Sequence, residues 1–148
     1  HGSSAFVLGF GRVGMTLAGM LSALGAQTTV VARSTAQRAR AVEMGCRVTD
    51  FRSLPAVISE ADVIFNTVPA LVLNAKVLKV TRPDVLVIDL ATKLGGTDFE
   101  VARALGRQAL LAPSLPGKVA PKTAGRIFAR VVIDLLTEEK SLALAVGP

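Results

Sequence analysis

Three glycines near the start of the chain have the spacing of a phosphate-binding turn. Gly9, Gly11 and Gly14 follow an apolar run at residues 5–8 and precede a stretch with helical apolar spacing. In such a turn the first glycine allows a tight bend, the second lets the backbone approach a pyrophosphate, and the third lets the helix pack against the strand. Because a helix N-terminus attracts negative charge, the segment predicts a dinucleotide site, the alternative being glycines that only serve helix packing in a domain without nucleotide. The predicted contacts are Gly9, Phe10, Gly11, Arg12, Val13 and Gly14.

The residues after the second predicted strand indicate which dinucleotide binds. An acidic side chain there would bind the ribose 2′-hydroxyl of NAD and repel the 2′-phosphate of NADP. This chain has Arg33 and Ser34 instead, and Arg38 follows about one helical turn later. A guanidinium offers a planar set of donors to a phosphate, so NADP is the predicted coenzyme. NAD remains the alternative, because an arginine in this place can also only stack on adenine or form a solvated basic edge.

The fourth, fifth and sixth predicted strands, at residues 63–66, 85–89 and 109–112, are expected to be parallel strands of one sheet. The residues at their ends are therefore expected on the same edge of that sheet. The nicotinamide half of the coenzyme is expected against Asn66, Thr67, Val68 and Pro69. The alternative is that this segment is an ordinary exit from a strand into a loop. In the next loop Lys93 could hold a substrate carboxylate, and Asp89 could orient a lysine or accept a proton. The alternative for Asp89 is an aspartate that only accepts backbone hydrogen bonds. Lys118 belongs to a loop rich in proline and glycine and is expected to bind an anionic substrate, the alternative being a solvated lysine beside a rigid helix start.

The composition excludes several kinds of site. His1 is the only histidine, and the chain has no tyrosine, no tryptophan and a single cysteine, Cys46. Acid–base chemistry therefore falls to lysine, aspartate or another domain, no metal site is predicted, and Cys46 is expected in the core of a protein from a reducing cytoplasm. The net charge of +6 is spread along the chain without interleaved aromatic residues, so no nucleic-acid site is expected. Arg12 and the glycines interrupt the apolar stretch of residues 5–26, which argues for a soluble protein without a membrane span.

Short apolar runs alternate with helical patterns along the 148 residues. This rhythm predicts an α/β fold, a Rossmann-like doubly wound parallel sheet of about six strands with helices on both faces. Strands are expected at residues 5–8, 28–31, 47–49, 63–66, 85–89 and 109–112, and helices at residues 12–24, 34 or 35–45, 54–60, 73–80, 97–106 and 122–139. Residues 1–4 are expected to be the remnant of an expression tag, and residues 5–148 a single dinucleotide-binding domain from the C-terminal part of a longer chain.

Two of these helices carry specific boundary signals. The first helix is expected to face the sheet with Val13, Leu17, Met20, Leu21 and Leu24. Gly25 can adopt the left-handed conformation that commonly ends a helix. Thr97 and Glu100 have the spacing of a capping box, so they predict the start of a helix that Gly106 ends.

Three blocks of the sequence resemble one known family. They are the glycine turn with the residues after it (9–18), residues 89–91 together with 95–99, and residues 115–125. With these blocks, the chain from residue 5 to about residue 136 is similar to the family of A-type subunits of dipicolinate synthase. The last two blocks are more specific than the glycine turn, which many dehydrogenases share.

The resemblance implies an oxidoreductase that acts in the mother-cell cytoplasm of sporulating bacteria. Its reaction would oxidise dihydrodipicolinate to dipicolinate by hydride transfer to NADP, and formation of an aromatic ring would favour the product. The implied partners are a small dicarboxylate substrate, an N-terminal domain of the same chain and a flavoprotein-like B-type subunit. A homo-oligomer is also compatible with the sequence. The fragment alone is expected to be inactive, because the cleft between domains would be incomplete.

Two other functions remain open at this point. The cofactor domain of a 2-hydroxyacid or shikimate-type dehydrogenase has the same sheet and glycine turn, and only trials with substrates separate it from the first hypothesis. A non-catalytic nucleotide-sensing regulatory domain binds dinucleotides without chemistry. Such a module would favour an acidic residue where this chain has Arg33.

Overall fold

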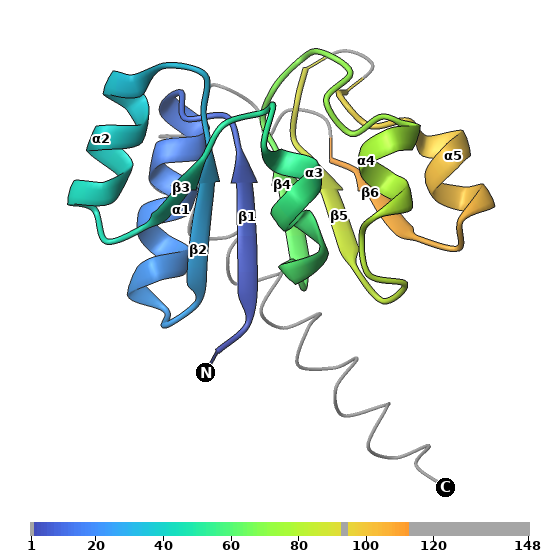
Figure 1. Cartoon of the computed structure of the whole chain (residues 1–148), viewed down its shortest axis with the longest axis horizontal. Coiled ribbons are helices and arrows are strands. Elements are labelled where there is room, and N and C mark those ends of the chain that lie inside the picture. Colours follow the sequence, from blue (N-terminus) through green and yellow to red (C-terminus); the bar gives the residue numbers. More distant parts are fainter. Residues whose placement is uncertain (1, 93–94, 113–148) are drawn as a thin grey trace, which may run out of the picture.

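The computed structural model describes residues 2–92 and 95–112, which form a parallel sheet with helices on both faces (Figure 1). The described strands are β1 (Ser4–Leu8), β2 (Gln27–Val31), β3 (Arg47–Thr49), β4 (Val63–Asn66), β5 (Leu86–Asp89) and β6 (Gln108–Leu111). They lie in the order β3-β2-β1-β4-β5-β6, and every neighbouring pair is parallel. The predicted doubly wound α/β arrangement is confirmed.

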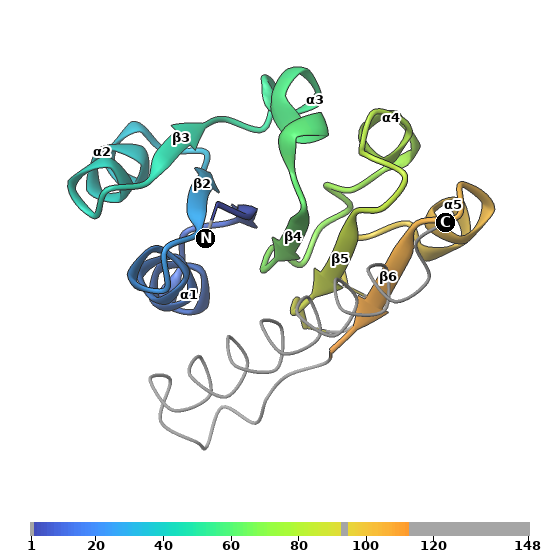
Figure 2. The same cartoon turned by 90° about the horizontal axis from the view of Figure 1, so that it is seen from below.

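The described helices are divided between the two faces of this sheet (Figure 2). On one face lie α1 (Arg12–Ala23) and α2 (Thr35–Glu43), and on the other lie α3 (Leu54–Val57), the 3-10 helix η1 (Ile58–Glu60), α4 (Ala75–Lys79) and α5 (Phe99–Ala104). Neighbouring side chains of β1 show the division, because Val7 belongs to the apolar cluster of α1 while Phe6 belongs to the cluster of α3 and α4. Strands buried on both faces in this way read as continuous apolar runs, which is why the sequence marked them clearly.

Because all described strands are parallel, their carboxyl ends meet at one edge of the sheet, the upper edge in Figure 1. The glycine turn follows β1 at this edge, Arg33 follows β2, Thr67 follows β4 and Leu90 follows β5. The edge therefore gathers the loops that the sequence singled out.

The buried face of α1 differs from the predicted one. The helix packs on the sheet with Gly14, Leu17, Ala18 and Leu21, whereas Val13 is 55 % exposed and Leu24 is 51 % exposed. Small residues let the helix approach the strands closely, so the contact line follows Gly14 and Ala18 rather than the outermost large side chains. Gly25 has a φ of 86°, and the predicted left-handed helix end is confirmed.

The predicted capping box at Thr97 is wrong. Asp98 caps α5 by accepting a hydrogen bond from the Val101 N–H (3.1 Å), because the Thr97 hydroxyl donates instead to the buried Asp89 (2.6 Å). The predicted helix at 73–80 is shorter, since Leu73 pairs with Thr97 as an isolated bridge and Asn74 caps α4. The predicted helix at 54–60 is divided into α3 and η1, and Cys46 lies in the core as expected. The predicted helix at 122–139 lies outside the described residues.

Candidate nucleotide-binding site

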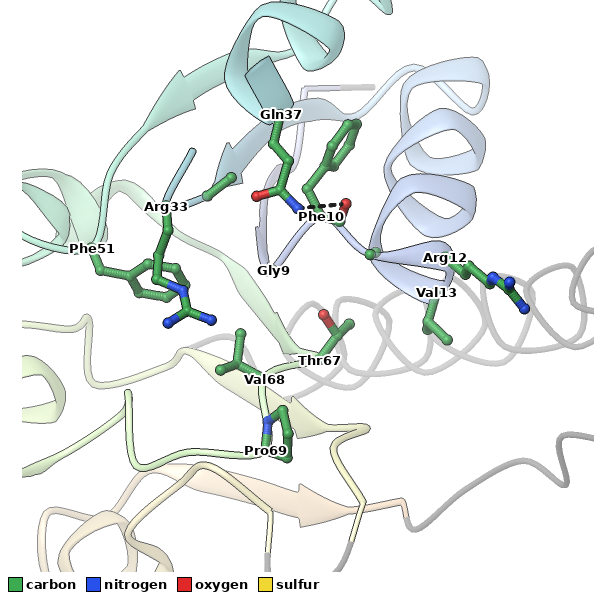
Figure 3. A pocket seen from close by; sticks show the side chains of 13 residues that line it. Gly9, Phe10, Arg12, Val13, Arg33, Gln37, Phe51, Thr67, Val68 and Pro69 are labelled. Atoms are coloured by element: carbon green, nitrogen blue, oxygen red, sulfur yellow. Dashed lines mark hydrogen bonds between the residues drawn. The ribbon is translucent and has the colours of Figure 1, made fainter. Parts of the chain in front are cut away.

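An open pocket of about 300 Å³ lies at the carboxyl edge of the sheet, between the glycine turn, the end of β2 and the loop after β4 (Figure 3). The residues that line it are Gly9, Phe10, Gly11, Arg12, Val13, Gly14, Ala32, Arg33, Gln37, Phe51, Thr67, Val68 and Pro69. The structure thus brings together all six predicted residues of the glycine turn with Arg33 and three of the four residues predicted at the end of β4 and after it. A concave site at this position is where open α/β sheets bind their ligands.

Each of the three glycines meets a different physical requirement. Gly9 has a φ of 93°, and a Cβ atom there would overlap the Thr67 hydroxyl, so the tight bend excludes other residues. A Cβ at Gly14 would overlap the carbonyl oxygen of Gly9, because the helix touches the turn at this point. At Gly11 a Cβ would meet nothing within 4 Å, so the pocket beside it is open to a ligand. The geometry expected of the turn is present, and the coenzyme contact itself stays a prediction.

The N-terminus of α1 faces this opening. Gly11 is the N-cap residue, no side chain caps the helix, and no acidic residue occupies its first turn. The first N–H groups of a helix have no partner within the helix, and they carry the positive end of its dipole. Arg12 and Val13, the first helical residues, line the pocket, so these N–H groups fit a phosphate.

The three residues predicted to bind the 2′-phosphate have different surroundings. Arg33 lines the pocket and is exposed (Figure 3). Ser34 caps α2, because its hydroxyl oxygen accepts a hydrogen bond from the Gln37 N–H (3.1 Å). Arg38 donates from Nη1 to the carbonyl oxygens of Ala32 and Arg33, at 2.8 Å each, and therefore holds the end of β2 against α2. Of the three, only Arg33 lines the pocket.

The loop after β4 forms the opposite side of the pocket. Thr67, Val68 and Pro69 line it, and the Thr67 hydroxyl donates to the Leu8 carbonyl oxygen (2.8 Å), which joins this loop to β1. Asn66 does not line the pocket, because its side chain is fully buried behind Val68. Its amide donates to the Val68 carbonyl oxygen and accepts from the Val68 N–H, at 3.0 Å each.

Of the three candidate catalytic residues, the structure describes one. Asp89 is fully buried, and within the described residues it accepts hydrogen bonds from Asn66 Nδ2 (3.2 Å), the Ala91 N–H (3.0 Å), the Gly96 N–H (2.7 Å) and the Thr97 hydroxyl (2.6 Å). Two of these donors are backbone N–H groups, as in the alternative role weighed for Asp89, and the other two are the side chains of Asn66 and Thr97. Lys93 and Lys118 lie outside the described residues.

Three lining residues were missed by sequence reasoning. Gln37 lies in the first turn of α2, four residues after Arg33, and its amide donates to the Phe10 carbonyl oxygen (3.3 Å), so its closeness to Arg33 in the sequence was a usable signal. Ala32 immediately precedes Arg33 and could have been included with it. Phe51 lines the same side as Arg33 in Figure 3, but nothing in the sequence places the loop after β3 against the end of β2.

Two kinds of feature are absent from the described part of the chain. In residues 2–92 and 95–112, no group of three or more His, Cys, Asp or Glu side chains could hold a metal ion. Within the same ranges, every helix is too short or too polar to cross a membrane.

The chain is similar to known proteins in sequence and in structure. Residues 1–92 match the family of the D-isomer specific 2-hydroxyacid dehydrogenase, NAD binding domain. The chain is 49% identical over 138 residues to the A-type subunit of dipicolinate synthase from Bacillus subtilis (strain 168), and the match covers 93% of this chain and 46% of that protein. The resemblance inferred from the sequence is confirmed.

Solved structures give the same result. The crystal structure of the A-type subunit of dipicolinate synthase from Bacillus halodurans superposes with a TM-score of 0.77 and 49% identity, covering 92% of this chain and 47% of that chain. An imine reductase from Myxococcus stipitatus in complex with NADP+ has a TM-score of 0.65 and 21% identity, covering 76% of this chain and 41% of that chain, and supports the fold alone. The chain thus spans about half the length of the dipicolinate synthase relatives it matches.

Proposed function

Because this chain belongs to the family of NAD-binding domains of D-isomer specific 2-hydroxyacid dehydrogenases, we propose that it is the coenzyme-binding domain of a dipicolinate synthase. The glycine turn carries the coenzyme-binding part of this proposal, and the 49% identity to the A-type subunit from Bacillus subtilis supports the assignment to a dipicolinate synthase. Gly11 leaves the approach to the N-terminus of α1 open, while Gly9 and Gly14 fix the turn in the shape that a diphosphate needs.

The bound coenzyme is proposed to be NADP. When bound, it would accept a hydride from the ring of dihydrodipicolinate, which also loses a proton and becomes the aromatic dipicolinate. Arg33 would hold the 2′-phosphate at the mouth of the pocket, since a guanidinium binds phosphate with paired hydrogen bonds. The Ser34 hydroxyl accepts from Gln37 and keeps its own hydrogen for a phosphate oxygen. Thr67, Val68 and Pro69 would orient the nicotinamide half.

Calorimetric titration of this chain with NADP⁺ and NAD⁺ tests the coenzyme assignment. We expect both to bind and NADP⁺ to bind about tenfold or more tightly, which corresponds to one good charge-assisted contact. A clear preference for NAD⁺ would overturn the NADP assignment. Failure of both nucleotides to bind would overturn the proposed function.

The substrate side of the site extends beyond the described residues. Dipicolinate carries two carboxylates, and Lys93 and Lys118 are the cations proposed to bind them. The remaining half of the longer protein, together with a flavoprotein-like B-type subunit, is proposed to complete the site, in the cytoplasm of the mother cell during sporulation. Since the chain spans about half of its relatives, it is proposed to bind coenzyme without turnover.

A reaction with the complete assembly tests the activity. The full-length protein, mixed with its B-type partner, NADP⁺ and dihydrodipicolinate, should give the ultraviolet absorbance of the aromatic product. Turnover of a 2-hydroxyacid instead would favour a 2-hydroxyacid dehydrogenase, an alternative that the matched family also supports. Binding of coenzyme with no reaction on either substrate would favour a sensing module.

A further inference from the structure

Behind the pocket, a buried polar network joins the loop after β4 to the loop after β5. Its members are Asn66, Asp89, Gly96 and Thr97, and the side chains of Asn66 and Asp89 are both fully buried. Asp89 Oδ2 receives the Asn66 amide at 3.2 Å, the Gly96 N–H at 2.7 Å and the Thr97 hydroxyl at 2.6 Å. Burying a carboxylate costs several kcal/mol unless such donors replace the water around it. The buried position of Asp89 therefore indicates a specific role for this side chain.

The network reaches the pocket through Val68. The Asn66 amide is turned so that Nδ2 faces both the Val68 carbonyl oxygen and Asp89, while Oδ1 accepts from the Val68 N–H. Both backbone polar groups of Val68 are therefore held by one side chain, and that side chain is oriented by Asp89. The Val68 side chain points into the space between the glycine turn and Arg33 (Figure 3).

The two loops are also in close contact at Gly96. The Gly96 carbonyl oxygen accepts from the Val72 and Leu73 N–H groups, at 3.0 Å each. A Cβ at Gly96 would overlap the Asn66 amide and the carbonyl oxygen of Ala70, and would lie 2.5 Å from that of Val68. A side chain at Gly96 would therefore displace the loop after β4, which lines the pocket.

We infer that Asp89 is a positioning residue for the coenzyme, which through Asn66 fixes the Val68 side of the nucleotide pocket and couples it to Gly96 and Thr97. The inference rests on the proposed function and gives Asp89 a role other than proton acceptor. A carboxylate suits this role because four donors meet its two oxygens. An asparagine would turn an NH₂ group toward at least one of these donors.

The test removes one hydroxyl of the network and compares it with a matched hydroxyl elsewhere. Thr97→Val is compared with Thr81→Val, because Thr97 and Thr81 are 6% and 5% exposed and both hydroxyls donate hydrogen bonds. Thr81 bonds to Leu78 and Arg107, which do not line the pocket. Both variants should lose similar stability, but only Thr97→Val should weaken coenzyme binding, by roughly threefold to tenfold.

Three additional measurements sharpen the result. Thr97→Ser keeps the hydroxyl and should restore the affinity for NADP⁺, whereas Asp89→Asn should weaken it by about tenfold or more. Hydrogen exchange of the Val68 amide, measured below the melting temperature of each variant, should be faster in Thr97→Val than in the unmodified chain. In Thr81→Val it should be unchanged. Hydrogen exchange needs no ligand, so it tests whether the network holds Val68 even if the unmodified chain binds no nucleotide. Failure of the unmodified chain to bind nucleotide would contradict the proposed function separately. Equal affinity and equal Val68 exchange in the two valine variants would overturn the inference.

Discussion

At the scale of single residues, Gly11 and Gly14 are held by different constraints. A Cβ at Gly14 meets the carbonyl oxygen of Gly9, a backbone atom that cannot turn away, while a Cβ at Gly11 meets open space. Gly14→Ala should therefore lower the free energy of unfolding by about 3 kcal/mol or more. Gly11→Ala should cost about 1 kcal/mol or less, because alanine is a poorer N-cap, and yet weaken coenzyme binding about tenfold or more.

Urea unfolding and calorimetric titration of the two glycine variants measure both effects. The unmodified chain is the reference for stability and for affinity. A Gly11→Ala variant that binds coenzyme as tightly as the unmodified chain would contradict the close approach of a diphosphate at this position.

Arg33 carries the predicted choice between coenzymes. It is exposed at the pocket, and reversing its charge should repel a 2′-phosphate but leave the rest of the dinucleotide in place. Arg33→Asp should thus lower the affinity for NADP⁺ by about 100-fold and that for NAD⁺ by about threefold or less. Arg103→Asp on α5 is the control, because it makes the same charge change at an exposed residue that does not line the pocket. Equal losses for both coenzymes in Arg33→Asp would show that Arg33 does not read the phosphate.

At the scale of elements, the start of α2 combines a structural and a binding role in Ser34. Its oxygen caps the helix, and its hydrogen is the part predicted to reach a phosphate. Aspartate caps helices as well as serine does, but it is an acceptor only and carries a negative charge. Ser34→Asp should therefore keep the melting temperature within about 2 °C and lower NADP⁺ affinity about tenfold or more. Ser34→Ala, which loses the cap, should instead lose about 1 kcal/mol of stability.

The opposite edge of the sheet holds a charge-dependent contact between strands. Arg82 bridges Asp62, just before β4, and Asp84, just before β5, at 2.7 and 2.8 Å. The hydrogen bond from Arg82 holds the pKa of Asp84 below its ordinary value of 3.8. A carboxyl group with a lowered pKa in the folded state stabilises the fold above its unfolded pKa, and this contribution is lost as the pH falls through the folded pKa.

Arg82→Gln should consequently be less stable than the unmodified chain at neutral pH, by a small amount because both partners are well exposed. The difference should become smaller at an acidic pH below 3.8, the ordinary pKa of Asp84, because the contribution of this carboxyl group is lost as the pH falls. Urea midpoints at the two pH values measure it, and high salt should reduce the difference at neutral pH. A stability difference that stays constant with pH would mean that Arg82 acts through packing.

The same elements show how far sequence reasoning reaches. Strands β1, β4 and β5 were found within one residue because they are buried on both faces, which leaves an unbroken apolar signal. Local rules failed where a distant partner competes for a side chain. Thr97 looks like an N-cap until Asp89 is known to lie beside it, and Asp98 then takes the cap.

The candidate site divides in the same way. The glycine turn and Arg33 were predictable because their chemistry follows from spacing along the chain. The roles of Arg38 and Asn66 were not predictable. Arg38 donates hydrogen bonds to the Ala32 carbonyl oxygen, and Asn66 donates to the Val68 carbonyl oxygen and to the Asp89 carboxylate, which the fold brings near. Phe51 is a residue that only the packing of the loop after β3 reveals.

At the scale of the whole molecule, the net charge of +6 should act on coenzyme binding at long range. NADP⁺ carries one more phosphate than NAD⁺, so its affinity should fall more steeply with salt. Raising the salt from about 0.1 M to about 1 M shortens the screening length from about 10 Å to about 3 Å, which removes distant attraction and leaves contacts such as that of Arg33. Calorimetric titration at both salt concentrations should therefore show a smaller, but persistent, preference for NADP⁺. Arg103→Asp, which lowers the net charge by two, should weaken NADP⁺ binding at low salt only. If the affinities for the two coenzymes fell equally steeply with salt, the extra phosphate would lie outside the basic part of the surface.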